Sequence, residues 1–284
     1  MESGSLSLFI DSNQINQNGF FAVERNNQQL GDVRLGSGVY HSLALLNLPG
    51  SCSKSLIDLK RFLLQGITLR FPLPHRQTLK ELSTCRGMHE DALWAYCSRN
   101  PLIKYIYLKR LSAAISLIPK GTSVLEIGCG SGMLLSAMKV ETAIGVDFHN
   151  ELSLISGKMR KAGHELNLLR CDLRHPPFRE KAFNCIIGVS VVEHLDQSDL
   201  ARAFQELRRL LIPSGILVLG YPIENLIVRL FFWVMRFDFT REHPSKASDI
   251  REATLSCFHN VERLRLPHAK LPDLLAYYEL TVAS

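Results

Sequence analysis

The clearest pattern along the chain is a regular alternation of short apolar runs with segments of helical spacing, beginning near residue 123. Short apolar runs bounded by turn residues are typical of buried strands, and apolar residues three or four apart are typical of amphipathic helices. The pattern predicts helices from about 133, over 151–162 and over 196–211, and strands at 123–127, 142–146, 167–171, 184–189 and 216–220. This order predicts an α/β fold with a doubly wound, mostly parallel sheet.

The C-terminal part of the chain changes its period. Residues 248–258 have helical spacing, whereas 261–266 and 278–282 alternate between apolar and other residues with a period of two. Two closing antiparallel strands would complete a seven-stranded sheet. The segment 222–248 comes before them, and its core, 223–239, has helical spacing, so we expect a helical insertion before the last two strands.

The N-terminal third is less regular. Residues 20–23 could form a short strand, and residues 55–65 have helical spacing. A longer helical pattern covers 90–118 and is interrupted at Asn100-Pro101. We therefore expect residues 1–89 to be an N-terminal extension that packs on the core or covers its mouth, and 90–284 to form the sheet domain.

Composition places the chain among globular proteins, with 46% hydrophobic and 21% charged residues. The formal charge of +6 is modest, and solvated surface side chains explain it as well as an anionic substrate or a membrane surface does. Seven cysteines without a C-x-x-C pair favour a reducing, cytoplasmic setting, and no metal site is expected. The N-terminus lacks the basic region of a secretory signal, and the longest apolar run, 226–239, is too short and too charged to span a bilayer.

The most informative motif runs from Glu126 to Gly132, directly after the first regular strand, and has the pattern E-x-G-x-G-x-G. Glycine adopts positive φ and lets a ligand approach the backbone. Such a turn at a helix N-terminus is where α/β sheets bind adenosine-containing cofactors. The dinucleotide pattern G-x-G-x-x-G/A fits neither register, because its last position would be Met133 or Leu135.

Two aspartates follow at the ends of the next strands. Asp147 ends the second strand, 19 residues after Gly128, where a carboxylate can accept hydrogen bonds from both ribose hydroxyls. The alternative is a helix cap or an ordinary loop carboxylate. Asp172 ends the third strand, and its alternative role is likewise that of an ordinary residue after a strand.

Together these residues resemble the class I methyltransferases that use S-adenosylmethionine. The likeness extends over 172–178, 183–195 and 207–215, with Asn184 and Ser214 in place of the usual Asp and Gly, and is closest to the group that includes quinone-biosynthesis and small-molecule methyltransferases. It implies S-adenosylmethionine as cofactor, with Glu126 facing its cationic methionine end and Asp172 accepting from the adenine amine. The cofactor-binding residues that it implies are Glu126, Gly128, Cys129, Gly130, Gly132, Asp147, Phe148, Asp172, Leu173 and Ser190.

The resemblance implies methyl transfer by in-line displacement, in which a general base is needed only if the acceptor must lose a proton. His194, in the loop after the fourth strand, is the catalytic candidate, although a structural or cofactor-side role is the alternative. Tyr221, Trp233 and His243 are candidates for acceptor contact. The insertion 222–248 is interpreted as a lid over the acceptor, and a core-packing helix is the alternative for 223–239.

The chain shows no basic patch interleaved with aromatic residues, so we expect a small, lipophilic acceptor and no nucleic acid. An amphipathic 223–239 resting at a membrane surface would make a cytoplasmic protein membrane-peripheral. Three alternatives remain: a nucleic-acid or protein methyltransferase, a non-catalytic partner-binding protein of the same fold, and, more distantly, an NAD-dependent dehydrogenase. The acceptor, the methylated atom and the oligomeric state are not predicted by the sequence.

Overall fold

The structure is a computed structural model, and it describes residues 20–25, 28–34, 71–85, 90–226, 228–230, 243–266 and 276–284. The chain divides into two compact units, Met1–Leu64 and Gln65–Ser284. In the first unit, β1 (Phe20–Arg25) pairs antiparallel with β2 (Gln28–Arg34) and includes the strand predicted at 20–23. The helical pattern at 55–65 lies outside the described residues.

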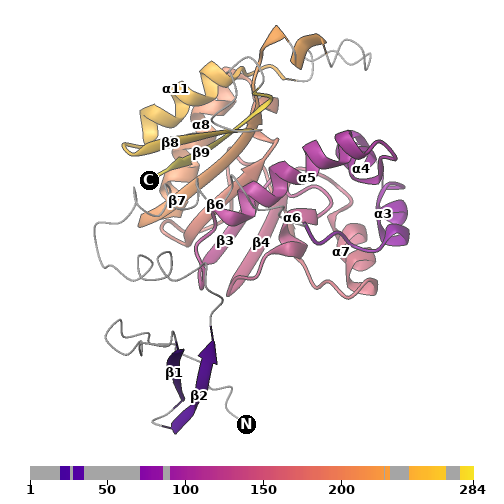
Figure 1. Cartoon of the computed structure of the whole chain (residues 1–284). Coiled ribbons are helices and arrows are strands. Elements are labelled where there is room, and N and C mark those ends of the chain that lie inside the picture. Colours follow the sequence, from indigo (N-terminus) through magenta and orange to yellow (C-terminus); the bar gives the residue numbers. More distant parts are fainter. Residues whose placement is uncertain are drawn as a thin grey trace. The chain divides into compact units, whose positions relative to one another are not determined.

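The second unit is built on a seven-stranded sheet with the order β5-β4-β3-β6-β7-β9-β8 (Figure 1). The first five of these strands in chain order are parallel, and β9 runs antiparallel to both β7 and β8. This confirms the predicted doubly wound sheet with two closing antiparallel strands. The strands are β3 (Ser123–Ile127), β4 (Thr142–Asp147), β5 (Asn167–Arg170), β6 (Phe183–Val189), β7 (Leu211–Pro222), β8 (Val261–Leu266) and β9 (Tyr278–Ala283).

Helices flank the sheet, and most begin where the sequence predicts. The helical pattern at 90–118 is two helices, because the Asn100 side chain accepts hydrogen bonds from the backbone N–H groups of Leu102 and Ile103 and caps the second helix. Pro101 occupies its first turn, where no N–H is needed. The helices are α3 (Arg76–Leu82), which was not predicted, α4 (Glu90–Cys97), α5 (Pro101–Ser116), α6 (Met133–Ala137), α7 (Leu152–Lys161), the 3-10 turn η3 (Val192–His194), α8 (Gln197–Leu210) and α11 (Ala247–Cys257).

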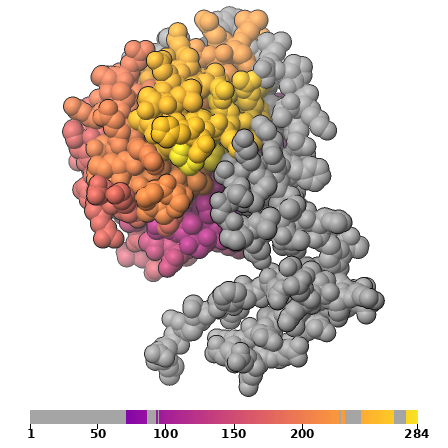
Figure 2. All heavy atoms as spheres, turned by 90° about the vertical axis from the view of Figure 1, so that its left-hand side faces the viewer, coloured from indigo at the N-terminus to yellow at the C-terminus, as the bar shows by residue number. Residues whose placement is uncertain are grey.

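One face of the sheet is covered by α8 and α11. Alternate strand residues point to this face, among them Leu125, Ile127, Leu217 and Leu219, and all are buried. In the view turned by 90°, orange atoms of residues near 200–220 adjoin the yellow atoms of the C-terminal segments in one surface (Figure 2). The apolar face of α8 meets them with Leu200, Ala203, Phe204, Leu207 and Leu210.

The opposite face of the sheet is crossed by α5 (Figure 1). The strand residues that alternate with those facing α8 and α11 point to this face. Val124 and Glu126 belong to it, because they alternate with Leu125 and Ile127. Val124 is fully buried, as expected for a strand between two helical layers. Glu126 is only 4% exposed, so the sheet places a carboxyl group in its interior beside the cofactor motif.

The predicted insertion is described only at its ends. Residues 226 and 228–230 are helical, and the chain is described again from His243; Trp233 and most of 223–239 lie outside the described residues. The lid therefore stays a prediction. Among the described helices, none has the length and apolar character needed to cross a membrane.

Candidate functional site

A cavity of about 540 Å³ opens at the carboxyl ends of β3, β4 and β6. The strand order reverses on either side of β3, and ligands of doubly wound sheets bind at this reversal. The volume lies within the range of about 300–1,000 Å³ that is usual for small-molecule sites. The cavity is lined by His194 and by all the predicted cofactor residues except Gly132: Glu126, Gly128, Cys129, Gly130, Asp147, Phe148, Asp172, Leu173 and Ser190.

The glycine turn has positive φ at each of its glycines, +62° at Gly128, +49° at Gly130 and +70° at Gly132. A Cβ on Gly128 would lie 2.3 Å from a methyl carbon of Val191, and one on Gly132 would lie 2.5 Å from a methyl carbon of Leu166. At Gly130 no atom of the described chain lies within 4 Å of that position. Gly130 therefore offers bare backbone to the cavity, whereas Gly128 and Gly132 allow close packing behind it.

Asp147 holds the turn in place. Its Oδ2 accepts a hydrogen bond of 2.8 Å from the Gly130 backbone N–H, and its Oδ1 accepts one of 3.2 Å from the His149 N–H. Each carboxylate oxygen has a further lone pair available for a ligand. Asp147 therefore stabilises the loop through both carboxylate oxygens. Each oxygen can still accept a hydrogen bond from a ligand in the cavity.

Asp172 is held by Arg174, a neighbour that no sequence pattern marks as a site residue. Arg174 Nη2 lies 2.6 Å from Asp172 Oδ2, and Arg174 Nη1 lies 3.0 Å from Asp199 Oδ2. The hydrogen bonds from Arg174 lower the pKa of Asp172 to about 2, so this carboxylate is ionised at neutral pH. Arg174 and Asp199 also line the cavity. Their pairing joins the loop after β5 to the first turn of α8, which spacing along the chain does not reveal.

Glu126 is the buried carboxyl of the site. Burial raises its pKa well above the usual value, the backbone N–H of Leu135 opposes the rise, and the nearby charge of Asp147 adds to it. Within the described part of the chain, its Oε2 has no hydrogen-bond partner. A carboxyl group in this state is complementary to a cation, because a positive charge would stabilise its ionised form.

Tyr96 and Arg110 also line the cavity and were missed from the sequence. The guanidinium carbon of Arg110 lies 3.9 Å from the ring centroid of Tyr107 and 5.0 Å from that of Tyr278, and its Nη1 donates to Ser190 Oγ at 3.3 Å. Its Nε is buried without a partner among the described residues. In the sequence, a lone arginine on a helix before the first parallel strand has the pattern of a solvated side chain.

Ser190 stands at the end of β6 with φ of +57°, a conformation that costs energy for a residue with a Cβ. Its N–H donates to the Gly220 carbonyl at 2.8 Å, and its Oγ lies 3.0 Å from the hydroxyl of Tyr278. These bonds fix the unusual backbone, as is common where a loop must present groups to a ligand.

The candidates for acceptor contact fall in three different places. Tyr221 is fully buried, with hydrogen bonds to Glu279 and Thr281, and is not among the residues that line the cavity. Trp233 lies outside the described residues. His243 is half-buried, and its ring centroid lies 5.1 Å from that of His194. Among the candidates that the structure describes, the fold thus brings together His194 and His243.

Comparison with protein families matches residues 125–219, from β3 to β7, to the family described as "Methyltransferase domain". These residues, about a third of the chain, thus match a methyltransferase domain. Its cofactor is S-adenosylmethionine, as the glycine motif predicts. The finer prediction, a place in the small-molecule and quinone-biosynthesis group, is not confirmed.

Curated relatives of this methyltransferase domain match over about a third of the chain. "Probable tRNA methyltransferase 9B" of Mus musculus is 33% identical over 100 residues, covering 35% of this chain and 21% of the relative. The tRNA (carboxymethyluridine(34)-5-O)-methyltransferase alkbh8 of Xenopus tropicalis is 32% identical over 102 residues, covering 36% and 15%. The match thus spans about a fifth or less of the length of these relatives.

A solved structure, the PH0226 protein of Pyrococcus horikoshii OT3, superposes with a TM-score of 0.48 at 18% identity. It covers 67% of this chain and 95% of that one. At this level of identity the likeness says nothing about function.

The relatives overturn one prediction from the sequence. A small-molecule acceptor without nucleic acid was expected, whereas the matched relatives are named as tRNA methyltransferases. That prediction is wrong because it rested on the lack of a basic, aromatic-interleaved patch. Such a patch is a signal in sequence order, and cations from separate helices and loops do not produce one.

Proposed function

We propose that this protein is an S-adenosylmethionine-dependent methyltransferase that acts on RNA, with transfer RNA as the first substrate to test. The likeness of residues within its methyltransferase domain to relatives named as tRNA methyltransferases carries this proposal. The relatives are much longer than the matched segment, so their activities are hypotheses for this chain.

Several residues of the cavity have a proposed role toward the cofactor. Asp147 accepts from the ribose hydroxyls while it holds the glycine turn, and Asp172 accepts from the adenine amine while Arg174 keeps it ionised. Phe148, whose side chain is 66% exposed, offers an apolar surface beside the adenosine. Glu126 faces the cationic end, where its unpaired oxygen gains an opposite charge. The cofactor supplies an activated methyl group on a sulfonium.

Arg110 supports an anionic oxygen as the acceptor. It lines the cavity from α5 and lies against the rings of Tyr107 and Tyr278. Its buried Nε has no hydrogen-bond partner among the described residues and can donate to a ligand. A guanidinium binds a carboxylate with planar, charge-assisted hydrogen bonds. A carboxylate acceptor needs no general base, so binding and alignment would account for most of the rate. The name of the Xenopus relative specifies transfer to an oxygen.

A second hollow, of about 670 Å³, offers a place for the RNA backbone between α3 and α7. Lys80, Lys158 and Lys161 line it, together with one carboxylate, Glu81. The last turn of α7 is basic, with Lys158, Arg160 and Lys161. Phosphate contacts by such cations supply much of the affinity for nucleic acid and make it dependent on salt.

The test is transfer of tritiated methyl groups from S-adenosylmethionine to total tRNA, with RNase-treated tRNA and a mixture of small carboxylic acids as comparison acceptors. We expect label in the intact tRNA fraction, which mild alkali releases if the product is an ester. A Lys80→Ala/Lys161→Ala variant should bind tRNA more weakly and with a smaller salt dependence. Lys120→Ala is the matched control, since Lys120 is exposed in the turn before β3 and does not line the hollow. Label in small acids but not in tRNA would overturn the proposal.

A further inference from the structure

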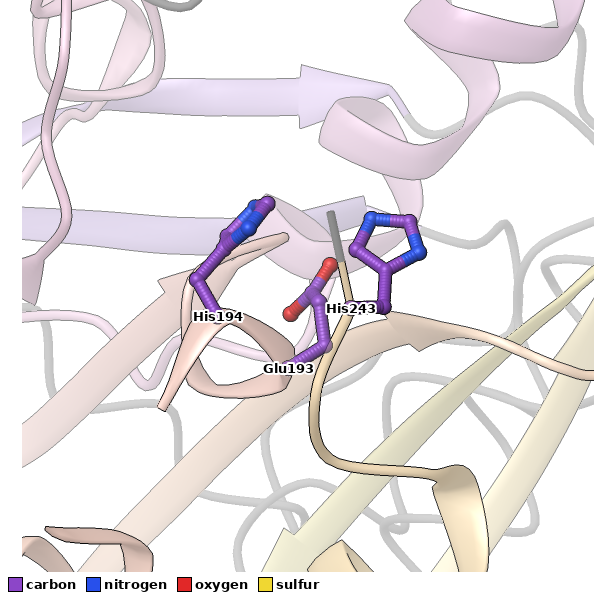
Figure 3. Close-up of side chains that lie close together, drawn as sticks. All are labelled: Glu193, His194 and His243. Atoms are coloured by element: carbon purple, nitrogen blue, oxygen red, sulfur yellow. The ribbon is translucent and has the colours of Figure 1, made fainter. Parts of the chain in front are cut away.

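Three side chains from two distant parts of the sequence meet at the edge of the cofactor cavity. Glu193 and His194 belong to the η3 turn after β6, and His243 lies in the segment that leads into α11. Their ligand-capable atoms all lie within 4.8 Å of one another. The Glu193 carboxylate projects between the two imidazole rings (Figure 3).

The carboxyl group of Glu193 is the unusual member of this cluster. The residue is only 1% exposed, and neither carboxylate oxygen has a hydrogen-bond partner among the described residues. A buried carboxyl group without a partner costs several kcal/mol unless it is protonated, paired or bound to a metal. Its burial therefore requires an explanation, and the two adjacent imidazoles indicate that the three groups bind a ligand together.

The backbone holds the two segments of the cluster together. The Ser245 N–H donates to the Glu193 carbonyl at 3.2 Å, and Ser245 Oγ donates to the Leu195 carbonyl at 2.6 Å. Ser245 is 2% exposed, so these bonds are shielded from water. They fix His243 opposite η3 independently of any ligand, which is how a preorganised site is built.

We propose that Glu193, His194 and His243 form a binding site for a divalent transition-metal cation such as Zn²⁺. Two imidazoles and one carboxylate are a common ligand set for Zn²⁺ and for other borderline divalent ions. Around one ion with bonds of about 2.0–2.2 Å, ligand atoms lie within roughly 4.4 Å of each other, so small side-chain rotations close the set.

The position of the site beside the cofactor cavity would allow a bound ion to take part in catalysis. Three protein ligands leave coordination positions open, which is the arrangement of catalytic rather than structural metal sites. His194 lines the cofactor cavity, so an open position on this side can hold an oxygen of the acceptor. The ion would orient that oxygen and stabilise its negative charge as a Lewis acid. Metal binding itself does not depend on which acceptor the enzyme uses.

The site departs from the expectation that the chain holds no metal. Glu193 and His194 are adjacent in sequence, and His243 follows 49 residues later, beyond α8 and β7. No short ligand motif of the H-x-x-x-H or C-x-x-C kind links them, so only the tertiary fold reveals the cluster.

Titration of the full-length, tag-free protein with Co²⁺ tests the proposal, after treatment with EDTA and dialysis. We expect saturable binding of one equivalent, visible ligand-field absorption, and displacement by Zn²⁺. Glu193→Gln and His243→Asn should each weaken Co²⁺ binding by more than about 100-fold, because changes outside the ligand shell alone cost about 10–100-fold. His259→Asn is the matched control, since His259 is exposed after α11.

Affinity for S-adenosylhomocysteine, measured on each variant, separates metal loss from misfolding. A variant that keeps this affinity and loses Co²⁺ supports the site. The proposal is overturned if the wild-type protein shows no saturable Co²⁺ binding. It is equally overturned if folded Glu193→Gln and His243→Asn proteins bind Co²⁺ as tightly as the wild type.

Discussion

At the residue scale, the two glycines that line the cavity have the same sign of φ and different surroundings. Gly128 is packed against the side chain of Val191, whereas Gly130 faces open space. Positive φ costs a residue with a Cβ about 1–2 kcal/mol wherever it occurs. Comparing a Cβ added at Gly128 with one added at Gly130 therefore isolates the contribution of packing to the loss of stability.

We predict that Gly128→Ala destabilises the protein by about 2–5 kcal/mol, because backbone strain and overpacking against Val191 add together. Gly130→Ala should cost only about 1–2 kcal/mol, the strain alone. It should nevertheless lower affinity for S-adenosylhomocysteine, since the new methyl group stands at the cavity wall. Urea unfolding and calorimetry measure both effects, and equal losses of stability would contradict this account.

Glu126 gives a prediction on pH. Burial raises its pKa, so the carboxyl group holds a proton in the unliganded protein over a range where a solvated Glu would be ionised. A sulfonium beside it favours the ionised form, so binding of S-adenosylmethionine should release a proton and become tighter as pH rises. Binding of S-adenosylhomocysteine, whose sulfur is neutral, should depend less on pH.

Calorimetry in buffers of different ionisation enthalpy measures that proton directly. In Glu126→Gln the difference in proton release between the two ligands should disappear, because the titrating group is gone. If the variant retains the difference, another group carries the proton and Glu126 does not face the sulfonium.

Site residues could be predicted from the sequence where they lie next to the end of a predicted strand. Asp147 is the last residue of β4, Asp172 comes shortly after the end of β5, and both line the cavity. Arg110 and Tyr96 reach the cavity from helices before β3, and Arg174 acts through a contact with Asp199 on α8. Such residues depend on how helices pack across the sheet, which no local pattern encodes.

At the element scale, β7 and β9 are joined by a buried polar cluster as well as by their ladder. Tyr221 donates to Glu279 at 2.9 Å and lies 2.7 Å from the Thr281 hydroxyl. Glu279 is fully buried and is paired with Arg251 of α11 and Arg265 of β8. The cluster ties the antiparallel edge of the sheet to its parallel part and explains why a tyrosine, rather than a phenylalanine, stands in this core.

We predict that Tyr221→Phe lowers the free energy of unfolding by about 1–3 kcal/mol, because Glu279 and Thr281 lose a buried partner. Methyl transfer should be unaffected in the folded variant, since Tyr221 does not line the cavity. Tyr277→Phe is the control, as its hydroxyl makes one long hydrogen bond of 3.5 Å to the Ile106 carbonyl. Identical urea midpoints for the two variants would argue against a structural role for the Tyr221 hydroxyl.

Elements with strong periodicity were predicted with their type and order, including the two closing strands with a period of two. The 3-10 turn η3 and the short helix α3 were not, because three to seven residues carry too little periodicity. This matters for the proposed metal site, because η3 carries two of its three residues.

At the scale of the whole molecule, the fold follows from local patterns and the acceptor does not. The alternation of strands and helices defines the sheet, and the glycine motif indicates the cofactor. In the proposed function, acceptor choice depends on groups that only the folded chain assembles, such as Arg110 on α5 and the lysines between α3 and α7. The net charge of +6 does not predict the acceptor, because it does not show where on the surface the basic side chains cluster.

The position of β9 has a consequence for how the chain acquires its activity. β9 is later in sequence than β8, yet it lies between β7 and β8, so β8 joins the sheet only through it. On the ribosome, β3 to β7 can assemble first, while β8 waits unpaired until residues 278–283 have emerged. Tyr278 of this strand also contacts Ser190 and Arg110. A nascent chain stalled before residue 278 would therefore lack the Tyr278 contacts to Ser190 and Arg110, two residues that line the cofactor cavity.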